Sequence, residues 1–197
     1  RFAVKRAANV QAYAQADWHL RGADMVIEDY LRTQLTDIPP FDLNVLLKDM
    51  EPIVLPMDGG VLTIALRGGD DCFALGALAN SSGRIQFRQL LETLGWDTLT
   101  AATITSQAAD WIDADSQALP GGAEDYAYLD GNPGHRTANT AFTSVSELRA
   151  LRGLDEAGYQ RIRPFVCTRK GEGQSYLNVN ALSPFHAPLL ASVLTGA

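Results

Sequence analysis

No stretch of this sequence is apolar for the roughly 20 residues that a bilayer-spanning helix needs, and none has the pattern of a signal peptide. The chain opens on Arg1 rather than on methionine, so we expect a piece excised from a longer protein. Basic residues are few: 16 Lys and Arg stand against 23 Asp and Glu, which gives a net charge of −7. A nucleic-acid partner requires a basic surface, so this balance argues against one.

Motifs of common enzyme classes are absent as well. The sequence has no nucleophile elbow, phosphate-binding loop or zinc-protease helix. Its three histidines, His19, His135 and His186, lie in unrelated segments, where surface or packing roles are expected. We therefore expect no enzyme. A carbohydrate-active or phosphotransfer enzyme that uses acidic residues remains the alternative, because the distance between carboxylates cannot be read from a sequence.

Cysteine is scarce too. Cys72 and Cys167 lie far apart without the paired spacing of a zinc site. Two buried free thiols and one disulfide both fit the sequence at this point.

Acidic residues, in contrast, are concentrated in one stretch. Five carboxylates fall within sixteen residues: Asp110, Asp113, Asp115, Glu124 and Asp125. With Asp113 as the first position, Asp115, Gln117 and Glu124 take the third, fifth and twelfth, which is the ligand spacing of a calcium loop. The sixth position is Ala118 rather than glycine, so the loop would differ in shape from the helix–loop–helix calcium motif.

A solvated connection rich in Asp, Gly and Pro is the alternative explanation for this stretch. Carboxylates at this density repel one another unless a hard cation neutralises them. A structural calcium site is therefore the competing hypothesis, with Asp113, Asp115 and Glu124 as its first candidate ligands and Asp110 and Asp125 next.

The apolar spacing predicts several helices. Residues 1–35 repeat apolar side chains at three- and four-residue steps without proline, which predicts one helix of roughly 50 Å. A surface helix broken near Gly22 is the alternative. A second helix is predicted from Ser82 onward, with an apolar face within 87–94 and Gly95 as its stop, and a third over 103–112.

Strands are predicted before these two later helices. Ile53–Leu55 and Val61–Leu66 flank Asp58-Gly59-Gly60 and predict an antiparallel hairpin, and Cys72–Leu75 is a third strand candidate. An antiparallel sheet packed on the long helix is the expected core.

A helical hairpin is predicted after the acidic stretch. Ser144 and Glu147 have the spacing of a capping box, and a second helix is expected over 156–163. Together with four arginines, this pattern is also typical of a helix-hairpin-helix DNA-binding module. The neighbouring acidic stretch would repel phosphate, so a packing role is preferred. The arginines are Arg149, Arg152, Arg161 and Arg163.

Motifs spread over about residues 70–182 resemble one known family, in the family's order. They are Cys-Phe and Ala-Leu (72–73, 77–78), Asp-Trp-Ile-Asp-Ala-Asp (110–115), Gly-Ala-Glu-Asp (122–125), Arg-Thr-Ala-Asn (136–139), Val-Ser-Glu-Leu-Arg (145–149), Pro-Phe-Val-Cys (164–167) and Leu-Asn-Val-Asn-Ala-Leu (177–182). The chain resembles general secretion pathway protein K, the large minor pseudopilin of bacterial type II secretion systems.

The resemblance implies an α+β fold, in which a pilin-like long N-terminal helix packs on a small antiparallel sheet with a large inserted all-α domain. The corresponding parts are residues 1–80, with the helix and strands; 81–174, the helical domain with the acidic loop; and 175–197, a strand returning to the sheet and the start of another helix. It also implies a periplasmic, oxidising location and hence a disulfide between Cys72 and Cys167.

The implied function is structural: a calcium-stabilised subunit at the tip of the periplasmic pseudopilus, in protein export across the outer membrane. An inner-membrane helix would precede Arg1. The implied partners are the other minor pseudopilins, I and J and then H. They would be bound through the long helix, with these residues as candidates: Val4, Ala8, Val10, Ala14 and Trp18.

Overall fold

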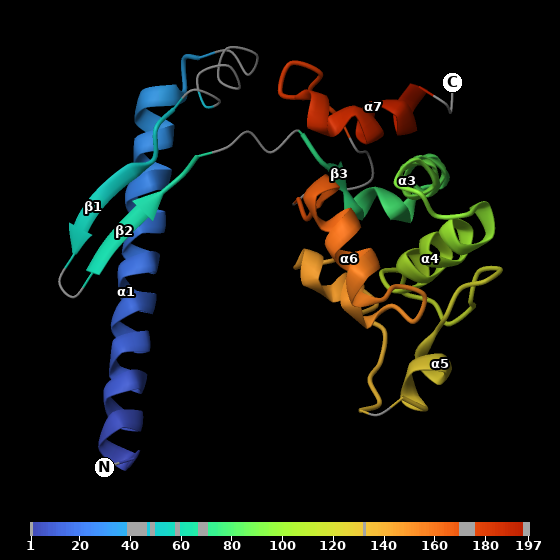
Figure 1. Ribbon diagram of the computed structural model, residues 1–197, viewed down its shortest axis with the longest axis horizontal. Coiled ribbons are helices and arrows are strands. Elements are labelled where there is room, and N and C mark those ends of the chain that lie inside the picture. Colours follow the sequence, from blue (N-terminus) through green and yellow to red (C-terminus); the bar gives the residue numbers. More distant parts are fainter. Residues whose placement is uncertain are drawn as a thin grey trace. The chain divides into compact units, whose positions relative to one another are not determined.

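The computed structural model describes residues 2–38, 47, 50–57, 60–66, 71–131, 133–169 and 176–194. The chain divides into two compact units, Arg1–Gly68 and Gly69–Ala197 (Figure 1). The expected fold class is confirmed: a long N-terminal helix, a small antiparallel sheet and a mostly helical remainder. The three-part division at residues 80 and 174 stays a prediction.

The first unit begins with one uninterrupted helix. Helix α1 spans Phe2–Leu35, as the apolar spacing predicts, and Gly22 does not break it. Nearly all its described side chains are exposed, and the ion pairs Asp17–Arg21 and Glu28–Arg32 lie on its surface. Exposed i,i+4 pairs add only about 0.3–0.5 kcal/mol each, so α1 gains little stability from its own surface. No helix among the described residues is long and apolar enough to cross a membrane.

The hairpin follows in the same unit. Strand β1 (Ile53–Met57) pairs antiparallel with β2 (Gly60–Ile64), with Ile53 opposite Ile64 and Leu55 opposite Leu62. The pairing confirms the predicted hairpin. Its side chains are largely exposed, and two strands alone bury little.

The third predicted strand forms but does not join the hairpin. Strand β3 (Phe73–Ala74) pairs in parallel with β4 (Val166–Cys167) in the second unit. The disulfide Cys72–Cys167 lies at the same place and links positions 95 residues apart. In the chain-entropy account, closing a loop of this size contributes about 4–5 kcal/mol. The start of the second unit is therefore held to a segment 95 residues further along the chain.

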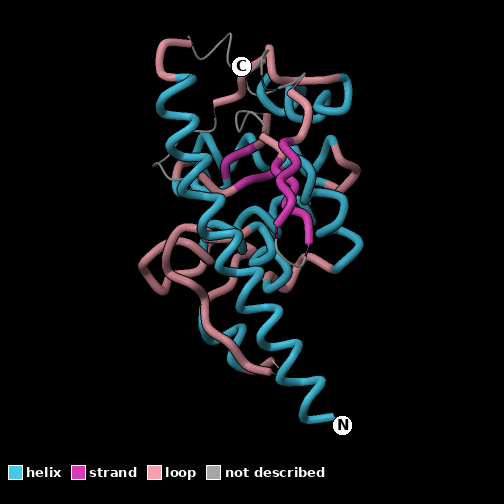
Figure 2. Tube along the Cα trace, turned by 90° about the vertical axis from the view of Figure 1, so that its left-hand side faces the viewer, coloured by secondary structure: helices cyan, strands magenta, loops and turns pink. Residues whose placement is uncertain are grey.

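The expectation of a core between sheet and long helix is wrong, because the buried apolar cluster of the described residues lies in the second unit. Helix α3 (Ser81–Thr93) packs against α4 (Thr98–Asp110), α7 (Ala187–Leu194) and the short 3-10 helix η1 (Leu75–Ala79) (Figure 1). Helices and loops make up most of the described chain, and strands form only a small part of it (Figure 2). A helix in this unit can bury its apolar side chains against several neighbouring helices at once. A hairpin of two strands can bury much less apolar surface.

Helix boundaries follow local signals. Phe87, Leu90 and Leu91 are buried on the predicted face of α3. The helix ends just before Gly95, whose φ of +100° is left-handed. Helix α4 begins earlier than predicted because the Asp97 carboxylate accepts hydrogen bonds from the Leu99 and Thr100 amides. A side-chain cap of this kind satisfies amides that lack partners inside the helix.

The second half of this unit contains the predicted helical hairpin in altered form. The capping box is present, since the Ser144 amide donates to the Glu147 carboxylate, but it begins the 3-10 helix η2 (Val145–Ala150). Helix α5 (Asp125–Leu129) precedes it, and α6 (Glu156–Ile162) with η3 (Arg163–Phe165) follows. The residues described after position 175 form η4 (Pro184–His186) and α7. The strand expected in this part of the chain does not form among those described residues.

Candidate metal centre

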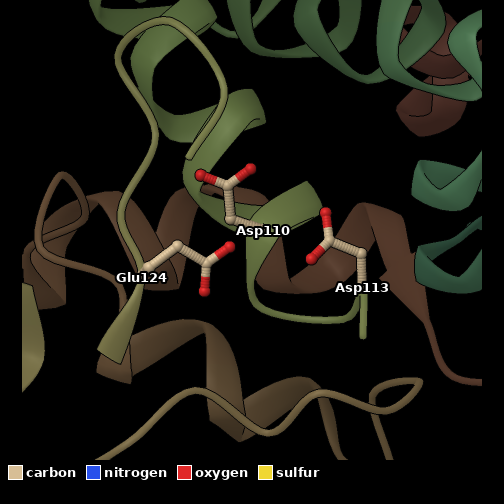
Figure 3. A group of neighbouring side chains, drawn as sticks. All are labelled: Asp110, Asp113 and Glu124. Carbon is tan, nitrogen blue, oxygen red and sulfur yellow. The ribbon is translucent and has the colours of Figure 1, made fainter. Parts of the chain in front are cut away.

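Three of the five predicted acidic residues come together in space. Asp110 is the last residue of α4, Asp113 follows one turn later, and Glu124 directly precedes α5 (Figure 3). One carboxylate oxygen from each lies within 4.8 Å of the others. The first and twelfth positions of the predicted loop therefore meet, with Asp110 as the third member.

Asp110 is fully buried and holds the loop that carries Glu124. Its carboxylate accepts hydrogen bonds from the Leu119 amide, at 3.2 Å from each oxygen, and from the Ala123 amide. Burial nevertheless raises the pKa of Asp110, because the charged form loses water that these two amides replace only in part. The carboxylate and the loop backbone therefore form one folded unit.

Glu124 and Asp113 each contribute a buried oxygen without a hydrogen-bond partner. Glu124 is only 2% exposed, and its Oε1 is unpaired. Burial, and then the charges of Asp113 and Asp110, raise the pKa of Glu124 to about 7. Oδ1 of Asp113 is also buried and unpaired, and burial followed by the charge of Asp115 raises its pKa.

Such orphaned acceptors are rare in folded proteins, because each one loses its hydration without compensation. A bound cation would supply the missing partner for both and would neutralise the mutual repulsion of the three carboxylates. All the donors are oxygens, which suits the hard cations Ca²⁺ and Mg²⁺ better than it suits zinc. The residues therefore fit a divalent metal.

The other two predicted ligands lie at the margin. Asp115 is exposed, and its Oδ1 accepts a hydrogen bond from the Gln117 amide at 2.8 Å. Asp125 faces a different loop, where it accepts hydrogen bonds from the hydroxyl and amide of Thr137 and pairs with Arg136 at 2.8 Å. The Thr137 hydrogen bonds hold the pKa of Asp125 below its ordinary value. Neither belongs to the three-carboxylate group.

Compensating positive charge is limited near the cluster. Arg84 lowers the pKa values of Asp110 and Asp113, but this is the smaller influence, and its guanidinium also donates to the Leu78 and Ala79 carbonyls. Protein groups alone thus leave the cluster undercompensated, which strengthens the case for a metal.

Sequence reasoning missed two aromatic residues near this site, Trp111 and Tyr128, and the role of one glycine. The Trp111 ring stands edge-on to Tyr128 at 5.6 Å, and its indole nitrogen donates to Glu147 at 3.3 Å. Gly122 packs so closely on Asp110 that a Cβ would lie 1.9 Å from its Oδ2. The pair Gly121-Gly122 marked a loop, but nothing in the sequence distinguished the two glycines.

The predicted partner-binding residues lie in α1, in the other unit. Val4, Val10 and Trp18 are 63–75% exposed, and Ala8 and Ala14 are exposed as well. Their role in binding stays a prediction.

Comparison with known proteins identifies the family. The family model for type II secretion system (T2SS), protein K, matches residues 68–171. Type II secretion system protein K of Pectobacterium carotovorum subsp. carotovorum is 33% identical over 91% of this chain and 58% of its own length. The protein of the same name from Pseudomonas aeruginosa is 35% identical over 97% of this chain and 59% of its own length. The chain thus spans about three fifths of these relatives.

A solved structure is similar as well. A chain in the crystal structure of the GspK-GspI-GspJ complex from the enterotoxigenic Escherichia coli Type 2 Secretion System matches with a TM-score of 0.75 and 25% identity. The match covers 95% of this chain and 69% of that one. These names denote a component of a secretion apparatus. The family model covers more than half of the chain, and the resemblance is confirmed: this chain belongs to the type II secretion system protein K family.

Proposed function

We propose that this chain is a minor pseudopilin at the tip of the type II secretion pseudopilus, with a structural role in protein export across the outer membrane. The observation that carries the proposal is the likeness, over nearly the whole chain, to a chain of a complex named for K, I and J. The partners are accordingly the pseudopilins I and J, and then H. The chain has no catalytic role.

Helix α1 offers the surface for this assembly. Large apolar side chains at Val4, Val10 and Trp18 stay in water, although burying a side chain of this kind contributes about 1.5–3 kcal/mol. Neighbouring pseudopilin helices would cover these residues together with Ala8 and Ala14, whose small side chains allow close approach. The helix would continue at its N-terminal end into an inner-membrane anchor, with the described units in the periplasm. A disulfide between Cys72 and Cys167 suits that oxidising compartment.

The size of the helical unit, Gly69–Ala197, favours a position at the tip of the filament. Gly69–Ala197 folds around its own core and is much bulkier than a hairpin, so a close-packed shaft would have no room for it. At the end of a filament the same bulk meets no neighbour on one side.

Calcium is the proposed ligand of the acidic cluster. Asp110, Asp113 and Glu124 supply carboxylate oxygens, and two of those oxygens lack any other partner. Calcium accepts six to eight oxygens at flexible angles, whereas magnesium demands a small octahedral shell. A cluster built from helix, turn and loop suits the more tolerant ion. The ion would have a structural role, by fixing a loop that otherwise carries self-repelling charge, and Asp115 and Asp125 remain candidates for a wider ligand shell.

Neither alternative function gains support from the geometry. Asp110 and Glu124 are buried, which leaves them no open face toward a substrate. Of the four arginines considered for DNA binding, Arg149 pairs with Glu156, Arg152 donates to the Ala127 carbonyl, and Arg161 stacks on Trp96. These arginines contribute to packing.

Two experiments test the proposal. Co-expression of the full-length protein with I, J and H should give one complex on purification, and a stable complex of the other three that excludes it would contradict the assembly role. Calcium, but not magnesium, at a hundredfold excess over its dissociation constant should stabilise the purified chain by about 2.7 kcal/mol. Equal melting temperatures with calcium and with chelator would contradict the metal.

A further inference from the structure

A tight turn closes the loop between Asp113 and Glu124. The Gly122 amide donates to the Leu119 carbonyl at 2.7 Å, with Pro120 and Gly121 as the two central residues. Gly121 has φ +79°, so the turn has the features of type II, which places proline second and a positive φ third. The turn explains the glycine at position 121 and leaves position 122 unexplained.

Gly122 meets a different requirement, which is space. A Cβ there would lie 1.9 Å from Oδ2 and 2.8 Å from Cγ of Asp110, and 3.0 Å from the Leu119 carbonyl oxygen. The Asp110 carboxylate cannot easily move aside, because it is fully buried and held by the Leu119 and Ala123 amides. The loop backbone can lie on this carboxylate only without a side chain at position 122.

We propose that Gly122 is a positioning residue of the metal centre. Its missing side chain lets the loop 119–123 close on Asp110, and this closure carries Glu124, two residues further on, to Asp110 and Asp113. The inference rests on the proposed calcium site for its functional meaning, but the closure itself involves only protein groups. Gly122 touches no ion and acts through the placement of two carboxylates.

The consequence of a methyl group at this position follows from the geometry. In Gly122→Ala either the loop lifts or Asp110 rotates, and both changes separate Glu124 from its partners. Sites of this kind lose function when a ligand moves by about 1 Å. Gly121→Ala is the matched control: it strains the turn through its positive φ, while the three atoms nearest to its Cβ all belong to Thr103, at 3.4 Å or more.

Terbium affinity measures the positioning role directly. Tb³⁺ resembles Ca²⁺ in its ligands, and excitation of Trp111, which lies between Asp110 and Asp113 in the chain, should sensitise its luminescence. Gly122→Ala should raise the terbium dissociation constant at least tenfold, whereas Gly121→Ala should change it less than threefold, although both lower the melting temperature in chelator. Equal weakening by the two variants would overturn the proposal, because turn strain alone would then account for it.

A double-mutant cycle in chelator separates this inference from the calcium proposal. If the collision is with Asp110, Gly122→Ala should lower the melting temperature by several degrees in the parent chain and by much less in an Asp110→Ala background. Gly121→Ala should lower the melting temperature by the same amount in the parent chain and in the Asp110→Ala background. Additive losses for Gly122→Ala, or failure to fold in both backgrounds, would overturn the proposal. A parent chain that binds no terbium would refute the calcium site, and the cycle would still decide the role of Gly122.

Discussion

Glu124→Gln should make the metal-free protein more stable above neutral pH and should remove its calcium response. The Glu124 carboxyl has a higher pKa in the folded chain than its ordinary value near 4.5. The folded state therefore holds the proton more tightly than the unfolded state, and this proton stabilises the fold. The contribution is complete below about pH 4.5 and is lost as the pH rises through about 7. Glutamine is neutral throughout and keeps the size of the side chain.

The magnitude follows from the pKa. One pKa unit corresponds to about 1.4 kcal/mol, so a rise from 4.5 to about 7 corresponds to roughly 3 kcal/mol. In chelator the variant and the parent should have similar free energies of unfolding at pH 5. At pH 8 the variant should be more stable by up to that amount. With calcium at a thousandfold excess over its dissociation constant, which stabilises the parent by about 4.1 kcal/mol, the order should reverse, because the parent keeps three ligand carboxylates and the variant keeps two.

Urea unfolding at several pH values between 5 and 8, in chelator and in calcium, measures these differences. Glu147→Gln serves as the control. Burial acts to raise the pKa of Glu147, but hydrogen bonds from Thr143 and Ser144 outweigh it and leave the pKa lowered. Its ionised form therefore stabilises the fold, and Glu147→Gln should cost stability at high pH. Parallel curves for the parent and Glu124→Gln in chelator would refute the account of the buried cluster.

Further predictions concern the metal, the disulfide and α1. Asp113→Ala should lower the melting temperature only when calcium is present, and an equal loss in chelator would point to a hydrogen-bonding role instead. Replacing Cys72 and Cys167 by serine should cost 2–5 kcal/mol in urea unfolding; a loss below 1 kcal/mol would contradict the constraint assigned to the bridge. Trp18→Ala should weaken co-purification with I and J without changing the melting temperature, since this side chain is 75% exposed. Lys5→Ala is the surface control, and equal binding by the two variants would argue against the apolar face.

Local signals in the sequence were sufficient for much of the fold. Helix α1, the hairpin and the cap at Ser144 depend on neighbours a few residues apart, and each formed as predicted. The location of the core could not be predicted from such local signals, because it depends on how many elements pack around each apolar face. Strand β3 is an example: its partner, β4, lies more than ninety residues further along the chain.

The sequence located the acidic segment that contains the candidate metal centre, but it did not predict which of its residues come together. Linear spacing assigned Asp115 and Gln117 to positions three and five, although the Asp115 carboxylate instead accepts the Gln117 amide. Glu124 and Asp125 are adjacent, yet one joins the cluster and the other pairs with Arg136. The end of α4, the turn at Gly121 and the close approach at Gly122 decide which side chains converge, and the linear spacing of the acidic residues does not show any of the three.

Light scattering on a mixture of the purified chain with the soluble parts of I and J measures whether this protein assembles with the other minor pseudopilins. We expect a single species with the mass of one copy of each protein, which forms in calcium and is weakened by Trp18→Ala. An I–J complex that forms while this chain elutes alone, in calcium and at high concentration, would contradict the proposed place of this protein at the tip.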